Sequence, residues 1–281
     1  MTERDLAQVV QECILLTRRT IVARSGGVVA ARRKGFGVEF YQLREYVAGD
    51  DVRYIDWKST SRMGKMMMRE CIELQQKSIL IVVDCSASMA FGGHCTKLTQ
   101  ARVIAAILAA VAQSQGDEVT VLWAGDTVQT VPVTSQEAAL RLVSTPVAAQ
   151  GIFSAQETVR HILAQRQVTM CIVVSDCIAI DLAALFAPLA ARIELQLICI
   201  TDPLEQRLPR AMILSAIDAE KECTMTIDAT IAGRLSLLQL QMQQQVDELC
   251  KRYGISPLTV GTEHQAAATL VERLNPLLQF A

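Results

Sequence analysis

Apolar runs and helical stripes alternate along most of this chain. Residues 79–83 form an unbroken apolar stretch, I-L-I-V-V, and stretches rich in apolar residues occupy 119–124, 169–174 and 193–200. A continuous apolar run of this length is typical of a strand that is buried on both faces of a sheet. Residues 96–115 carry apolar side chains at helical spacing. Strands that alternate with helices predict right-handed βαβ units and a central, mostly parallel sheet flanked by helices.

The pattern before and after this core predicts further elements. An apolar stripe predicts a helix over residues 5–19, and residues 127–133 can return beside the preceding strand as a hairpin. We also expect helices at 136–143, 182–191, 229–253 and 263–278, strands at 65–74 and 257–262, and a hairpin of 211–217 with 223–227. The predicted organisation is an N-terminal part, residues 1–75, with a helix, a basic arm and a charged β-turn segment, followed by an α/β domain at 76–281.

Composition narrows the class of protein. Of the 281 residues, 51% are hydrophobic and 4% aromatic, and the formal net charge is −2. Such a chain can bury a large core, and its balanced charge gives no general attraction for nucleic acid or a membrane surface. The longest apolar run, residues 103–112, is too short to span a bilayer, and the N-terminus lacks a signal-peptide pattern. We expect no nucleic-acid partner and no direct membrane insertion.

The cysteines indicate a reducing compartment. There are nine, an odd number, scattered along the chain without a C-x-x-C pair. Cys171 and Cys199 lie inside apolar strand runs, as buried free thiols do. His94 and Cys95, with Cys85 nearby, lack the fourth ligand and the spacing of a zinc site. We therefore predict a soluble, cytoplasmic protein.

Polar oxygen side chains follow the apolar run at residues 79–83. Asp84, Ser86 and Ser88 form the pattern D-x-S-x-S, which the parallel sheet would place at the carboxyl edge of its strands. Hard oxygen donors with few carboxylates suit Mg²⁺ or Mn²⁺. The pattern resembles the first element of the metal-ion-dependent adhesion site of von Willebrand factor A domains. Alternatively, Asp84 caps the next helix and the serines satisfy loop backbone groups.

Two charged segments precede this loop. Residues 18–34 are basic and glycine-containing, which suits either a solvated flexible segment or a docking arm for an acidic partner surface. Residues 37–62 combine paired charges with aromatic groups around a predicted turn at Gly49, Asp50 and Asp51. This cluster could be a catalytic acid–base group, but neither a nucleophile nor a histidine is nearby, so we favour a structural network with Tyr54, Ile55 and Trp57 packed beneath the turn. Its predicted structural or interaction residues are Arg44, Asp50, Asp51, Arg53, Asp56, Trp57 and Arg62.

A family resemblance becomes specific in the same segment. Residues 39–62 read E-F-x-x-x-R-x-Y-x-x-G-D-D-x-R-x-I-D-W-x-x-x-S-R, and D-x-S-x-S-M follows at residues 84–89. Residues 202–209 add D-P-x-E-x-x-L-P. Together these motifs resemble the bacterial family called domain of unknown function 58. The resemblance implies a von Willebrand factor A-like fold and a partner, a MoxR-type AAA+ ATPase, for which family members are thought to recruit client proteins.

The adhesion site of such a domain draws on three loops. The first is the D-x-S-x-S loop, and Ser175-Asp176 matches the acidic third loop. The second loop usually offers Gly-Thr-Asp, but here Ile152 and Phe153 stand at the threonine and acidic positions. Ser154 could substitute only after a small loop shift. We predict a weak Mg²⁺ or Mn²⁺ site, with an empty, hydrogen-bonded loop as the alternative. The predicted metal ligands are Asp84, Ser86, Ser88, Asp176 and Ser154.

These motifs favour a non-enzymatic interaction module, in which a bound metal accepts a carboxylate from a partner protein, as an adaptor for the ATPase and an unknown client. A metal-free scaffold of the same fold is the alternative. A third hypothesis, a hydrolase that uses Asp84 and Asp176 with metal-bound water, lacks a nameable general base or oxyanion donor. No phosphate-binding loop, dinucleotide fingerprint, nucleophile elbow or H-E-x-x-H motif occurs in the sequence.

Overall fold

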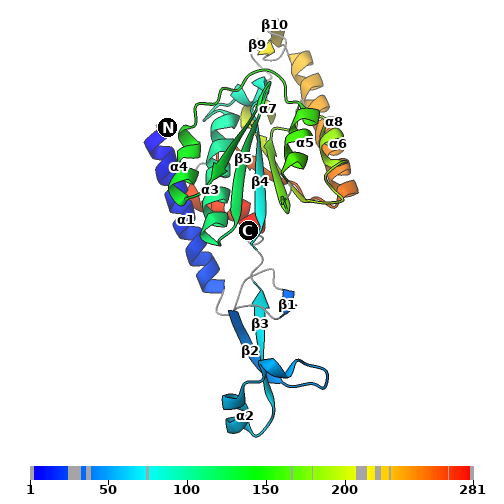
Figure 1. Ribbon diagram of the computed structural model, residues 1–281. Coiled ribbons are helices and arrows are strands. Elements are labelled where there is room, and N and C mark those ends of the chain that lie inside the picture. Colours follow the sequence, from blue (N-terminus) through cyan, green and yellow to red (C-terminus); the bar gives the residue numbers. More distant parts are fainter. Residues whose placement is uncertain are drawn as a thin grey trace. The chain divides into compact units, whose positions relative to one another are not determined.

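The chain forms two compact units in the computed structural model (Figure 1). The larger unit contains Met1–Ala23 and Lys77–Gln279, and the smaller one contains Arg24–Gln76. One boundary between the units lies near residue 76, and the N-terminal helix belongs to the larger unit. The structure describes residues 3–24, 33–35, 39–73, 76–165, 167–178, 180–206, 214–218, 223–227, 229–264 and 266–278.

A six-stranded sheet forms the centre of the larger unit, with the strand order β11-β8-β7-β4-β5-β6. Neighbouring strands are parallel except β5 and β6, which pair antiparallel. The mostly parallel sheet and the terminal hairpin are therefore confirmed. The strands are β4 (Ser78–Asp84), β5 (Glu118–Ala124), β6 (Val128–Val133), β7 (Met170–Ser175), β8 (Glu194–Thr201) and β11 (Leu258–Gly261).

Helices cover both faces of this sheet, as the side chains of β4 require (Figure 1). Ile79, Ile81 and Val83 enter one core cluster, and Leu80 and Val82 enter the other. The first cluster receives side chains from α1 (Glu3–Arg24), α3 (Lys97–Ser114), α4 (Gln136–Arg141) and α9 (Ala267–Leu278). The second receives them from α5 (Ala155–Ala164), α6 (Leu182–Phe186) and α8 (Ala229–Tyr253). Short helices are α7 (Pro203–Gln206), η2 (Ala87–Ala90) and η3 (Leu142–Ser144).

The N-terminal helix is part of the core. Leu6, Val10, Cys13 and Ile14 are buried in the first cluster, at the spacing that the apolar stripe predicted. The thiol of Cys13 also donates to the backbone carbonyl of Ala267 at 3.6 Å. The amphipathic stripe of α1 therefore packs on the sheet unit, which is why the predicted grouping of this helix with residues 24–75 was wrong.

The smaller unit is built on an antiparallel sheet with the order β1-β3-β2. Between β2 and β3 lie the 3-10 helix η1 (Val52–Tyr54) and a helix, α2, that the pattern did not predict. The side chain of Asp56 accepts a hydrogen bond from the Ser59 amide at its start, and Gly64 ends it with φ +68°. The bounds are β1 (Arg33–Gly35), β2 (Glu39–Glu45), β3 (Met67–Glu73) and α2 (Trp57–Met63).

A hairpin of β9 (Leu214–Asp218) and β10 (Cys223–Ile227) confirms the strand pair expected near residues 211–227, of which residues 211–213 lie outside the described part. Within the residues that the structure describes, no helix combines the length and the apolar character that a bilayer crossing requires.

Candidate functional site

The D-x-S-x-S loop begins where β4 ends. Asp84 is fully buried, because neighbouring strands flank β4 on both sides. Its Oδ1 accepts a hydrogen bond from the amide of Ser86 at 2.8 Å, and its Oδ2 accepts one from the hydroxyl of Ser175 at 2.7 Å. Both carboxylate oxygens of Asp84 therefore have a protein donor.

The two serines of the motif pair with each other. The hydroxyl oxygens of Ser86 and Ser88 lie 3.1 Å apart, and Ser86 is buried. The amide of Ala87 donates to the carbonyl of Gly151 at 3.0 Å, which fixes this loop to the second one. Asp84 is not the cap residue of either helix that follows, because Ser86 is the N-cap residue of η2 and Thr96 caps α3.

The third loop follows β7 and lies beside the first. The amide of Cys177 donates to the Ser175 hydroxyl at 2.8 Å, so Ser175 links both loops. Cys177 has φ 61°, a left-handed conformation that is unusual for a residue with a side chain. The loop turns there, and Oδ1 of Asp176 accepts a hydrogen bond from the Ile178 amide at 3.1 Å. The predicted juxtaposition of Asp84 and Asp176 thus has a structural basis in Ser175.

A lysine that the sequence reasoning missed lies at this site. Lys97 is the first residue of α3, and its side chain is 0% exposed. Its Nζ lies 2.7 Å from Oδ2 of Asp176 and 2.5 Å from Oε1 of Glu205, in α7. The ring of Phe91 lies on another side, with its centroid 5.7 Å from Nζ. A buried cation thus joins the third loop to the loop after β8.

Among the residues that the structure describes, no hydrogen bond joins a side chain of residues 150–154 to this cluster. Ile152 is 57% exposed, and Phe153 is buried in the second core cluster. Ser154 caps α5, because its hydroxyl accepts from the amide of Glu157 at 3.3 Å. The amide of Ile152 donates to Asp126 at 3.0 Å, which holds the loop in place. The predicted role of Ser154 as a ligand would require it to give up the helix cap.

A second polar cluster, also missed from sequence, lies at the ends of β8 and β11. Asp202 is fully buried and accepts hydrogen bonds from the amides of Gly93 at 2.9 Å and Leu204 at 2.8 Å. The hydroxyl of Thr262 donates to Oδ2 of Asp202, the same oxygen that accepts from Gly93, whereas Leu204 donates to Oδ1. Asp202 therefore joins the loop after β4, through Gly93, to the residue that follows β11, Thr262.

Burial and charge set the protonation of these groups. Burial, with the charge of Asp176 nearby, raises the pKa of Asp84 from 3.8 to about 6. Burial alone would lower the pKa of Lys97, but the charges of Asp176 and Glu205 outweigh it, and the pKa of Lys97 rises. Burial also raises the pKa of Glu205, against the attraction of Lys97. Lys97 is therefore charged at neutral pH.

The donors at this edge do not fit a resident divalent cation as they are arranged. Mg²⁺ requires oxygen ligands in near-octahedral geometry at about 2.0–2.1 Å. The carboxylate oxygens of Asp84 and Asp176 are already hydrogen-bonded, and the ammonium of Lys97 approaches Oδ2 of Asp176. Within the described residues, no group of three or more histidine, cysteine, aspartate or glutamate side chains is placed to hold a metal. The positive charge of this site comes from Lys97.

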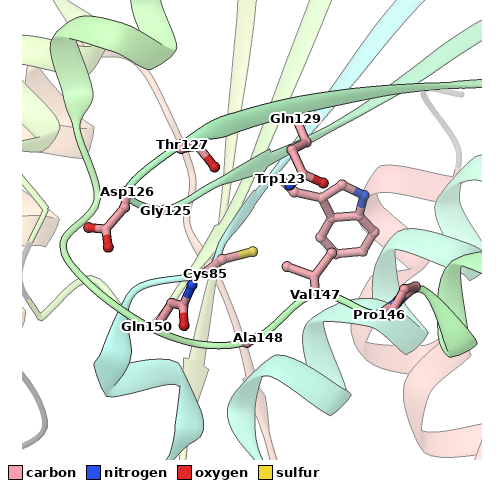
Figure 2. Close-up of a pocket in the computed structure, with 10 residues that line it drawn as sticks. All are labelled: Cys85, Trp123, Gly125, Asp126, Thr127, Gln129, Pro146, Val147, Ala148 and Gln150. Carbon is pink, nitrogen blue, oxygen red and sulfur yellow. The ribbon is translucent and has the colours of Figure 1, made fainter.

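A separate pocket lies at the ends of β4 and β5 (Figure 2). It has a volume of about 200 Å³, and Figure 2 shows the sulfur of Cys85 pointing toward Trp123 and Val147. None of the predicted metal ligands lines it. Burial raises the pKa of Cys85 to about 12, so the thiol in this pocket is not a ready nucleophile.

The charged segment of the smaller unit forms local ion pairs. Arg44 pairs with Asp50 at 2.6 and 2.8 Å, and hydrogen bonds from Arg44 help to lower the pKa of Asp50 to about 2. Arg53 pairs with Asp51 at 2.6 Å. These two pairs lie beside a turn at residues 48–50, and the structural or interaction role of the segment stays a prediction.

Three other predicted residues of this segment, Asp56, Arg62 and Trp57, take no part in these two ion pairs. Asp56 pairs with Arg69 at 2.8 Å and caps α2. Arg62 is exposed, and no ion pair to it is found among the side chains that the structure describes. Trp57 is 68% exposed, so the expectation that it packs beneath the turn was wrong, whereas Ile55 is buried. Trp57 is the first residue of α2, a helix in which no residue is buried.

The free cysteines agree with the sequence analysis. Cys13, Cys85, Cys171, Cys177, Cys199 and Cys250 are buried thiols, and Cys95 is partly buried. Side chains of Cys71 and Cys223 lie outside the described part, as do those of the basic arm at residues 18–34.

The fold and the position of the D-x-S-x-S loop define a von Willebrand factor A-like domain. The chain belongs to the family described as protein of unknown function DUF58, whose model matches residues 42–246. The predicted family and fold are thereby confirmed. Relatives include the uncharacterized proteins Mb1516 of Mycobacterium bovis and Rv1480 of Mycobacterium tuberculosis. Each is 31% identical over 251 residues, which cover 84% of this chain and 78% of the relative.

Similar solved structures include the conserved hypothetical protein BatB from Bacteroides thetaiotaomicron, with a TM-score of 0.45 and 14% identity, over 72% of this chain and 98% of that one. The SpRpn10 VWA domain has a TM-score of 0.41 and 11% identity, over 71% of this chain and 95% of that one.

Proposed function

We propose that this chain is a non-enzymatic protein-interaction module that docks a partner on the carboxyl edge of its central sheet. The proposed partner is a MoxR-type AAA+ ATPase, and the chain acts as its adaptor toward a client protein during assembly or maturation. Membership of the DUF58 family supports the choice of ATPase, because the family resemblance implies that association. Exposed apolar side chains and a groove at the carboxyl edge of the sheet support docking of a partner there.

The observation that carries the proposal is a set of four exposed apolar side chains on segments that are hydrogen-bonded to the D-x-S-x-S loop or continue from it. Phe91, Ile152, Ile178 and Leu204 are all exposed, and they come from four separate segments, of which Leu204 lies in α7. Apolar side chains that gather at one exposed edge are typical of a protein-interaction surface. We call these four residues the apolar ring.

Contacts between the loops bring the apolar ring together. The loop of Ile152 is joined to the D-x-S-x-S loop through the amide of Ala87. The loop of Leu204 is joined to it through Gly93, which donates to Asp202 and lies so close to Leu204 that an added Cβ would meet Cδ1 at 2.8 Å. The loop of Ile178 is joined to it through Ser175. The ring is therefore held by the same hydrogen bonds that order the polar centre.

A groove beside the ring offers depth for a partner side chain. It has a volume of about 500 Å³ and runs between the third loop and α8. Its walls include Ile178, Leu240 and Val246, with Asp176 and Glu205 at one side. An apolar pocket with a few polar groups is the usual setting of an anchor residue in a protein interface.

The polar centre supports binding rather than catalysis. A general base must reach a substrate proton, but Asp84 and Asp202 are fully buried, and Asp176 is paired with the buried Lys97. The same contacts support the metal-free form of the module, because a partner carboxylate would find no open metal position and Lys97 is buried. We propose that apolar side chains of the partner make the central contacts.

Isothermal titration calorimetry with a purified MoxR-type ATPase from the same organism tests the proposal. Ile178→Glu and Leu204→Glu should each weaken binding at least about tenfold, the effect of about 1.4 kcal/mol. Leu15→Glu is the matched control, because Leu15 is an exposed leucine on α1 rather than in the ring. EDTA should leave the affinity unchanged.

Unchanged affinity in both ring variants would contradict the proposed surface. Affinity that EDTA abolishes and Mg²⁺ restores would contradict the metal-free form and favour an adhesion site with a bound cation. No detectable heat with wild-type protein would contradict the choice of ATPase.

A further inference from the structure

We propose that Lys97 is the resident cation of this site, and that its ammonium takes the place that a divalent ion holds in a metal-dependent adhesion site. The inference concerns the chemistry of the site alone. It does not depend on the proposed partner.

The position of Lys97 is energetically unfavourable for a cation unless nearby anions offset its charge. A cation at the first position of a helix meets the positive end of the helix dipole, and the first turn of α3 contains no acidic residue. Complete burial adds the cost of removing the ammonium from water. A lysine in this place therefore requires strong compensation from nearby anions.

Two carboxylates from other elements provide that compensation. Asp176 and Glu205 approach Nζ at 2.7 and 2.5 Å, which are distances of charge-assisted hydrogen bonds. Asp176 follows β7 and Glu205 follows β8, so Lys97 joins two strand ends that would otherwise repel each other. The face of the Phe91 ring, 5.7 Å away, covers the ammonium from a further direction.

The left-handed residue next to Asp176 belongs to the same arrangement. Cys177, at φ 61°, reverses the chain so that its amide meets Ser175 while the amide of Ile178 meets Oδ1 of Asp176. These bonds leave Oδ2 of Asp176 for Lys97. The backbone of the third loop thus holds Asp176 in an orientation that suits an ion pair with the Lys97 ammonium.

The charges distinguish this arrangement from a metal site. The one lysine offsets one of the two carboxylates that it contacts, and a divalent ion placed beside it would face a fixed positive charge in a buried setting. Removal of the ammonium, with the chain length kept, would leave the carboxylates of Asp176 and Glu205 around a space without a cation. A metal should then bind where none bound before.

Electron paramagnetic resonance of Mn²⁺ titrated into the protein, after EDTA treatment and desalting, tests the inference. Wild-type protein should bind no Mn²⁺ at a single site up to 1 mM, roughly the weak end of known divalent-cation sites. Lys97→Met, which keeps an unbranched chain, should bind one Mn²⁺ at least about tenfold more tightly, and Lys97→Met with Asp176→Asn should lose that site. Lys251→Met is the matched control, since Lys251 is exposed in the last turn of α8.

One equivalent of Mn²⁺ bound by wild-type protein and lost in Asp176→Asn would overturn the inference, whatever the variants do. A folded Lys97→Met variant that gains no Mn²⁺ would overturn it as well. If Lys97→Met does not fold, Lys97→Gln serves the same comparison. Failure of the ATPase to bind would leave these outcomes unaffected.

Discussion

The hydroxyl of Ser175 donates to Oδ2 of Asp84 across 2.7 Å and joins two chain segments that are 91 residues apart. The two residues end adjacent parallel strands, β7 and β4. The same hydroxyl oxygen accepts the amide of Cys177, so one serine orders both the first and the third loop. The candidate site depends on this bond more than on any contact between the two aspartates.

Replacement of Ser175 by alanine should therefore destabilise the protein. The change leaves Oδ2 of the buried Asp84 and the amide of Cys177 without a partner, and an unsatisfied buried group costs about 1–3 kcal/mol. We expect that loss in the free energy of unfolding from urea denaturation. Ser144→Ala, at an exposed serine, should change it by less than about 0.5 kcal/mol. A Ser175→Ala variant as stable as the control would contradict the linking role.

The carboxylate of Asp202 should make stability depend on pH. Burial would raise its pKa, but the hydrogen bonds from Thr262, Gly93 and Leu204 outweigh burial and lower it. A lowered native pKa stabilises the fold above the unfolded value, 3.8, and that contribution is lost as the pH falls through the native value. Asp202→Asn should therefore cost about 1–3 kcal/mol at pH 7, because its amide group cannot accept from all three donors.

The difference between Asp202→Asn and wild type should shrink as the pH falls below about 4, when the wild-type carboxyl becomes protonated. Urea denaturation between pH 3 and pH 7 measures it. A constant difference over this range would contradict an ionised Asp202 as the source of the stability.

Lys97 and Glu205 should be energetically coupled. Loss of one partner from a buried ion pair costs about 3–5 kcal/mol, so Lys97→Met should be strongly destabilising. Glu205→Gln should cost less, because the carboxylate side chain is 20% exposed. In a double-mutant cycle the two changes should show an interaction of about 0.5–3 kcal/mol. Additive changes would mean that the two side chains stabilise the fold independently.

The turn in the smaller unit should depend on Asp50. Its carboxylate holds Arg44 with two hydrogen bonds and accepts the amide of Val47 at 2.9 Å. Asp50→Asn should accelerate hydrogen exchange of the Val47 amide by about tenfold, because the acceptor loses its charge. Asp51→Asn is the matched control, since Asp51 contacts Arg53 instead. Equal exchange rates in both variants would contradict this role of Asp50.

Much of the fold followed from the apolar pattern. The run at residues 79–83 is β4, and the stripe at 96–115 is α3, because burial on both faces or on one stripe leaves a clear periodicity. The pattern missed α2, whose seven residues are too few for a stripe and whose signals are the Asp56 cap and Gly64. It also misplaced α1, because a stripe shows that a helix packs but not on which unit.

The candidate site was only partly accessible from sequence. Asp84, Ser86, Ser88 and Asp176 are brought to one sheet edge, as the rule for parallel strands predicts. Lys97 was overlooked because a lysine at a helix start is usually solvated. One signal could have exposed it: the lysine violates the dipole preference and is followed directly by buried positions of α3. Glu205 and Asp202 entered only through the family motif, since their partners are distant in sequence.

The most direct test of the central claim is an anomalous difference map from crystals of wild-type protein soaked in Mn²⁺. We predict no manganese peak between the D-x-S-x-S loop and Asp176, and electron density that places the Lys97 ammonium between Asp176 and Glu205. A manganese peak at coordination distance from Asp176, with Lys97 turned away from both carboxylates, would contradict the account.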